Sequence, residues 1–128
     1  MKRTIPFNKF GENQELSFNI ATLAEFERIQ GKSIQQIAFS GNAGIDFCLK
    51  ALPLCLKRIN PDLYVKKIEK YLEEGGDIDD IATPIVHAIA ATGVLGKPLA
   101  ESALSIYYPE LYNAPEEKPK QEEDEKNV

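Results

Sequence analysis

Residues 15–31 read ELSFNIATLAEFERIQG, and they contain a change of hydrophobic period. Apolar and polar side chains alternate strictly from Glu15 to Ile20, which is typical of a half-buried β-strand. After that the apolar residues recur every three or four positions, as on one face of a helix, and a glycine follows. The helical positions are Leu23, Phe26 and then Ile29 or Gln30, with Gly31 as the stop. The stretch therefore predicts a strand that leads directly into a helix, with Thr22 and Glu25 as the capping box that opens the helix.

The residues before this stretch favour a second strand. Thr4–Phe7 can pair with the strand at Glu15–Ile20, and Phe10–Asn13 would form the turn between them. Pro6 has no backbone N–H, so it confines the first strand to an edge. We therefore expect a β-hairpin at the N-terminus.

The residues after Ile20 have helical signals throughout. Ser33 and Gln36 form a second capping box, which opens a short helix. Two longer apolar stripes follow, at Ile45–Ile59 and, after the break at Asn60-Pro61, at Tyr64–Leu72. A further helix holds Ile78 to Ile89 and starts either at Asp77 or at Thr83-Pro84, and a last one runs from about Pro98 to Tyr108. The expected fold class is mainly α (α+β): an N-terminal hairpin and a bundle of about five to six helices.

The last fifteen residues differ from the rest in composition. The segment 114–128 contains six acids, three lysines and one apolar residue after Ala114, so its net charge is −3 (three minus six). Such a segment cannot bury enough apolar surface to offset the entropy lost on ordering. We predict a globular helical domain at 1–113 and a disordered acidic tail at 114–128.

Composition excludes several classes of function. The chain has 128 residues and a net charge of −5, which argues against a nucleic-acid binder or a polybasic membrane patch. The longest apolar run, Ala51–Leu56, is far shorter than the roughly twenty residues of a membrane-spanning helix, and no secretory signal follows Met1. A cytosolic protein is expected.

Cys48 and Cys55 are seven residues apart, about 10 Å along a helix, so we expect two buried thiols and neither a disulfide nor a metal site.

The residues with catalytic or ligand-binding chemistry form no known motif. His87 is the only histidine, and a lone histidine on an amphipathic helix is typically a core or surface residue. Asp77, Asp79 and Asp80 lack the glycine and glutamate of a calcium loop and suit a helix N-terminus instead. We predict no catalytic residue, no metal and no cofactor. An enzyme would require a deep pocket where Asp77, Asp79 and His87 converge.

A cluster of apolar and aromatic residues near the end of the domain is the remaining candidate site. Such residues either contact a partner protein or close the core, and the sequence favours neither. The candidate partner-binding residues are Val94, Leu95, Ile106, Tyr107 and Tyr108.

The order of these features resembles a known family. The hairpin enters a helix across Glu15–Ile34, Tyr71–Ile81 reads YLEEGGDIDDI, Gly93–Lys97 reads GVLGK, and the chain then becomes charged. This order and spacing, over roughly residues 12 to 97, resemble the tail assembly chaperones of long non-contractile-tailed phages and prophages of Gram-positive bacteria. Pro53 and Pro84 depart from the pattern and leave the helix boundaries around them open.

The resemblance implies a non-enzymatic protein of the host cell cytoplasm that is absent from the mature virion. Such chaperones hold the long, helical tape measure protein soluble until the tail tube polymerises around it. Many have a longer form made by ribosomal frameshifting, whose extension is thought to recruit tail tube protein, and self-association is common among them. The alternative is a small helical protein-interaction adaptor or another virion assembly factor.

Overall fold

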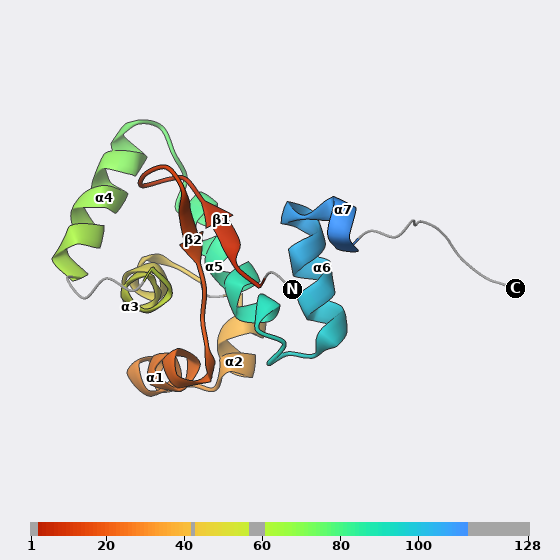
Figure 1. Cartoon of the computed structure of the whole chain (residues 1–128). Helices are drawn as coiled ribbons and strands as arrows, with labels where there is room; N and C mark the ends of the chain where they lie inside the picture. The colour runs from red at the N-terminus through yellow and green to blue at the C-terminus, as the bar shows by residue number, and fades with distance from the viewer. Residues whose placement is uncertain (1–2, 42, 57–60, 113–128) are drawn as a thin grey trace, which may run out of the picture.

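The computed structural model describes residues 3–41, 43–56 and 61–112, and in them the predicted fold class is confirmed. The chain is mainly helical and begins with a two-stranded antiparallel hairpin (Figure 1). The predicted acidic tail lies outside the described residues. The elements are β1 (Ile5–Phe7), β2 (Gln14–Leu16), α1 (Ile20–Gln30), α2 (Ile34–Phe39), α3 (Ile45–Cys55), α4 (Pro61–Glu73), α5 (Asp79–Ala91), α6 (Lys97–Tyr107) and the short α7 (Pro109–Tyr112).

The hairpin is shorter than the alternating pattern predicted. Ile5 pairs with Leu16, and both side chains are fully buried. The second strand ends at Leu16 instead of continuing to Ile20. The reason is tertiary: the Ser17 backbone N–H donates to the Cys55 carbonyl of α3 at 3.0 Å, which directs the chain away from β1.

The prediction of a Thr22–Glu25 capping box was wrong, because α1 begins earlier. Its N-cap is Asn19, whose Oδ1 accepts a hydrogen bond from the Thr22 N–H at 2.9 Å. Thr22 Oγ1 in turn accepts from the Asn19 N–H at 2.9 Å, so Thr22 is the third helical residue of the capping box and not its N-cap. Glu25 pairs with Arg28 instead. Gly31 ends the helix as predicted, with a left-handed φ of 69°.

The other helix boundaries follow the sequence signals closely. Ser33 and Gln36 form the predicted box at the start of α2. Pro53 lies inside α3, which ends at Cys55, and the remainder of the predicted stripe to Ile59 reaches residues outside those described. Helix α5 begins at Asp79 with Ile78 as its N-cap, two residues after the predicted start at Asp77. Pro84 lies inside this helix, so the alternative start at Thr83-Pro84 is wrong. The Asp77 carboxylate accepts from the Asp79 N–H at 2.9 Å, just before that helix begins.

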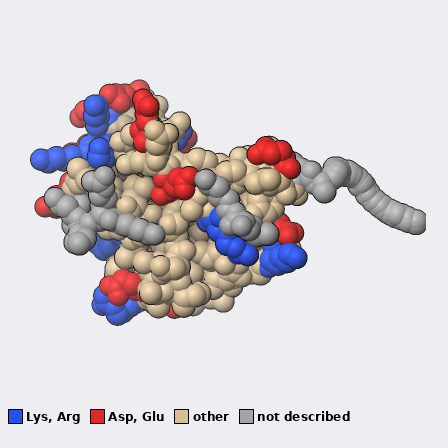
Figure 2. All heavy atoms as spheres, in the orientation of Figure 1, with Lys and Arg blue, Asp and Glu red and all other residues tan. Residues whose placement is uncertain are grey.

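Charge is distributed unevenly over the molecule. Helix α4 carries many of the lysines and acids, and α4 and α6 lie on opposite sides of the molecule (Figure 1). Figure 2 shows charged side chains crowded around α4, whereas much of the centre of the same face has none.

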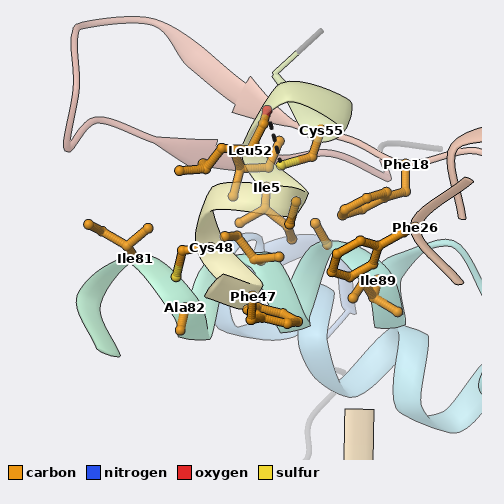
Figure 3. Packing of buried hydrophobic residues seen from close by; sticks show 14 of the residues in the cluster. Ile5, Phe18, Phe26, Phe47, Cys48, Leu52, Cys55, Ile81, Ala82 and Ile89 are labelled. Carbon is orange, nitrogen blue, oxygen red and sulfur yellow. Dashed lines mark hydrogen bonds between the residues drawn. The ribbon is translucent and has the colours of Figure 1, made fainter. Parts of the chain in front are cut away.

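Helix α5 is the centre of the core. It packs against α3, α6 and the hairpin, and more than half of its residues are buried. Figure 3 shows Cys48 and Leu52 of α3 on the same side of the core as Ile81 and Ala82 of α5. Aromatic rings fill the other end of this layer, where the Phe26 and Phe47 ring centroids are 5.5 Å apart. Because α3 and β1 cover one side of α5, its outer side is left to α6 and α2.

A candidate partner-binding groove

A shallow groove lies over α5, between the end of α2 and the outer side of α6. Its volume is about 180 Å³. Apart from His87 and Ser102, its lining side chains are apolar. The lining residues are Ala38, Phe39, Val86, His87, Ala90, Leu95, Leu99, Ser102, Ala103 and Ile106.

Three large apolar side chains on this groove remain open to solvent. Phe39 is 67% exposed, Ile106 59% and Leu99 41%. Leu99 and Ile106 are seven residues apart on α6, so they lie on one face of it. The opposite face of α6 buries its own apolar residues, chiefly Ala100 and Leu104, against α5. Helix α6 is therefore apolar on two sides, and the described part of the chain covers only one of them fully.

The structure separates the five candidate residues into two groups. Leu95 and Ile106 line the groove. Val94 precedes them in the connection between α5 and α6 and is 36% exposed, but it does not line the groove. Tyr107 and Tyr108 point elsewhere and are half-buried.

The two tyrosines make hydrogen bonds within the domain. Tyr107 Oη lies 2.8 Å from His87 Nδ1 and joins α6 to α5. The Tyr108 hydroxyl donates to the Thr4 carbonyl at 2.8 Å and ties the end of α6 to the start of the hairpin. These contacts support the interpretation that the tyrosines close the core.

Sequence reasoning missed Phe39 and Leu99 as groove residues. The spacing of Leu99 and Ile106 was a usable signal, because two apolar residues seven apart share a helix face. Phe39 carried no such signal. It belongs to the groove only because α2 lies close to α6 in space, and the two helices are far apart in the chain.

His87 is the titratable group of the groove. Its ring meets Tyr107 edge-on, with centroids 5.5 Å apart. Burial lowers the pKa of the imidazole below its ordinary value, because the charged form loses hydration. At neutral pH the ring is therefore uncharged, which suits an apolar surface.

His87 and the aspartates do not share a pocket. Asp79 and Asp80 line a separate depression of about 410 Å³ beside the hairpin, together with Lys9 and Tyr107. The Tyr71 hydroxyl donates to Asp80 Oδ2 at 2.7 Å, and this bond holds the pKa of the Asp80 carboxyl below its usual range. The convergence of Asp77, Asp79 and His87 that an enzyme would require is not what the structure shows.

The two cysteines are buried and free, as predicted. Burial raises the pKa of Cys48 to about 12, and it also raises the pKa of Cys55. The Cys55 thiol donates to the Leu52 carbonyl at 3.9 Å (Figure 3). Both sulfurs behave as small apolar groups in the core.

Within the described residues no cluster of three or more histidine, cysteine, aspartate or glutamate side chains could hold a metal ion. The helices of the described chain are all too short or too polar to cross a membrane. Comparison of the chain with protein-family models, with curated proteins and with solved structures found no match.

Proposed function

We propose that this protein is a phage tail assembly chaperone that binds the tape measure protein and keeps it soluble while the tail tube assembles. The observation that carries the proposal is the uncovered apolar groove formed by α2, α5 and α6, with Phe39, Leu99 and Ile106 at its surface. The order of sequence motifs supports the same family. The protein acts in the host cell cytoplasm, without catalysis.

The shape of the groove suits a helix better than a small molecule. Pockets for small ligands usually enclose roughly 300–1,000 Å³, and this groove is a shallower depression of about 180 Å³. An amphipathic helix can instead lay its apolar stripe over such a surface, with anchors spaced three, four and seven residues apart. A tape measure protein is long and helical, so it offers many such stripes.

The binding energy expected from the groove fits a chaperone that must release its client. Full burial of a leucine, isoleucine or phenylalanine contributes about 1.5–3 kcal/mol. Three partly exposed anchors therefore give only a modest gross gain, and ordering the client reduces it further. Binding at many sites along one client would protect its apolar stripes, and each contact would remain reversible.

The acidic character of the chain supports the same role. A net charge of −5 keeps a protein with exposed apolar surface soluble through mutual repulsion.

The proposal also includes two properties that the resemblance implies. They are contact with tail tube protein through a longer frameshifted form, and self-association. Sequencing the gene past the codon of Val128 tests the first of these, since an overlapping −1 reading frame after a slippery heptamer is expected.

Co-expression with the tape measure protein of the same genome tests the proposal. The wild-type chain should keep the tape measure in the soluble fraction. Ile106→Asp places a charge in the groove and should lose at least half of that effect. Ile45→Asp is the matched control, because Ile45 is 55% exposed at the start of α3 and does not line the groove.

Circular dichroism of both variants separates loss of binding from loss of fold. Equal rescue by Ile106→Asp and wild type would remove the groove from the proposal. No rescue by the wild-type chain, together with stable binding to a different virion protein, would favour the adaptor alternative instead.

A further inference from the structure

The groove contains one residue whose charge changes near neutral pH. His87 lies among apolar groove residues, with Val86 and Ala90 on its own helix and Ile106 across on α6. A histidine in this position is unusual for a purely apolar docking surface, because it can become a cation at mildly acidic pH.

The hydrogen bond between His87 and Tyr107 can form with the neutral ring. The 2.8 Å contact joins Tyr107 Oη to Nδ1 of His87. With the hydroxyl as donor, Nδ1 is the acceptor, and the ring carries its one proton on Nε2.

Among the described residues, the groups that face His87 include no carboxylate to stabilise the imidazolium, since Asp79 and Asp80 of its own helix line the separate depression beside the hairpin. From α6 the facing titratable group is Tyr107, and from α2 the groove residues Ala38 and Phe39 are uncharged. Strand β1 (Ile5–Phe7) has no ionisable side chain. Glu15 of β2 is exposed at the surface of the hairpin. On α3 the titratable side chain facing α5 is the buried Cys48 thiol, and Asp46 and Lys50 pair with each other at the surface. Arg3 binds the Ala91 and Thr92 carbonyls at the end of α5.

We infer that binding of an apolar partner in the groove is coupled to the protonation state of His87, so that the groove holds its partner at neutral pH and releases it on acidification. The inference rests on the proposed function for the identity of the partner, but its physical basis is the groove alone. An apolar partner removes the remaining water from the imidazole. The cation is then destabilised further, and a protonated His87 must release its proton to solvent before the partner can bind.

The sign of the effect follows from linkage. Burial already places the pKa of free His87 below 6.5, and the partner lowers it again. The complex therefore binds fewer protons than the free protein wherever the free ring is charged, and affinity falls as the pH falls through that range. For one proton the limit is a tenfold rise in Kd per pH unit.

The test uses two ligands at pH 7.5 and pH 5.5, a range that leaves most carboxylates ionised. One ligand is the tape measure protein, and the other is Nile red, an uncharged apolar dye. Ile106→Asp identifies the part of the dye signal that belongs to the groove. We expect both Kd values to rise at the lower pH, by at most about tenfold because the pKa of free His87 lies below 6.5.

His87→Gln is the diagnostic variant. Glutamine can still accept the Tyr107 hydrogen bond but does not ionise, so its Kd should be the same at both pH values. Tyr107→Phe keeps the ionisable ring and should keep the pH dependence. Because His87 is the only histidine, its NMR titration in a tag-free chain is unambiguous, and its pKa should fall when Nile red saturates the groove.

The outcomes separate the inference from the proposed function. Equal pH profiles for wild type and His87→Gln, an unmoved His87 pKa, or no Ile106-dependent dye signal would each overturn the inference. Tape measure binding could survive any of these. Conversely, a His87-dependent dye profile without tape measure binding at either pH would support the inference and contradict the proposed function.

Discussion

At the scale of single residues, burial decides what the reactive side chains of this protein do. Cys48 and Cys55 are at most 1% exposed, and His87 is half-covered by the groove. In each case the neutral form is favoured because the charged form would lose its hydration. The groups that stay charged, such as Glu25 with Arg28, lie at the surface and pair there.

The thiols provide a direct test at this scale. With the pKa of Cys48 at about 12 and that of Cys55 also raised, neither sulfur forms thiolate near neutral pH. We expect Ellman's reagent at pH 8 to label the native protein very slowly and both thiols at once after denaturation in guanidinium chloride. Rapid labelling of one thiol in native buffer would show that the core around α3 is open.

At the scale of elements, tertiary contacts decide which local sequence signal sets the boundary of a helix or strand. At the start of α1 the sequence predicts a box of Thr22 with Glu25, whereas the structure forms one of Asn19 with Thr22. The bond from Ser17 to the Cys55 carbonyl ends the strand early, so the helix can begin at once and Asn19 becomes the cap. Where no competing contact exists, as at Ser33, the local signal predicts the boundary correctly.

Substitution of the cap distinguishes the two boxes. Asn19→Ala removes an acceptor for the first turn of α1 and should lower the free energy of unfolding by about 1 kcal/mol. Glu25→Ala is the control, because Glu25 caps nothing and its pair with Arg28 is exposed. Urea denaturation followed by circular dichroism measures both. A larger loss for Glu25→Ala than for Asn19→Ala would restore the box predicted from the sequence.

At the scale of the whole molecule, α5 is enclosed by α3, the hairpin and α6, but this enclosure is incomplete. The α6 face that contacts α5 closes the core, and the face with Leu99 and Ile106 is left partly exposed by the residues that the structure describes. The hydrogen bonds of Tyr107 and Tyr108 hold α6 in this position at its end. The groove is therefore a consequence of the fold, and a partner need not create it.

The stability of the domain should depend on pH through the α5–α6 contact. The pKa of His87 is lowered in the folded state, whereas an unfolded histidine titrates near 6.5. As the pH falls through 6.5 the unfolded state binds the proton first, so the free energy of unfolding decreases towards the folded pKa. Urea midpoints should fall from pH 7.5 to 5.5 in wild type and fall less in His87→Gln. Identical decreases in both would assign the effect to other groups.

The sequence by itself determined the elements of this protein, because hydrophobic period and end signals are local properties. The alternation before Asn19, the helical stripes after it, and the stops and starts at Gly31, Ser33 and Pro61 were all readable from neighbouring residues. So was the burial of the cysteines on one face of α3. Helix starts that depend on a distant hydrogen bond, as at Asn19, were not.

Only the tertiary structure decided which apolar residues remain uncovered. A periodic pattern marks Tyr107, Tyr108, Leu99 and Ile106 alike as apolar positions of one helix, and it cannot say which of them α5 and the hairpin will cover. Phe39 becomes part of the groove because packing brings α2 to the outer side of α6. An apolar side chain stays exposed when the packed helices leave it uncovered. Its exposure is therefore defined only once the helices have packed.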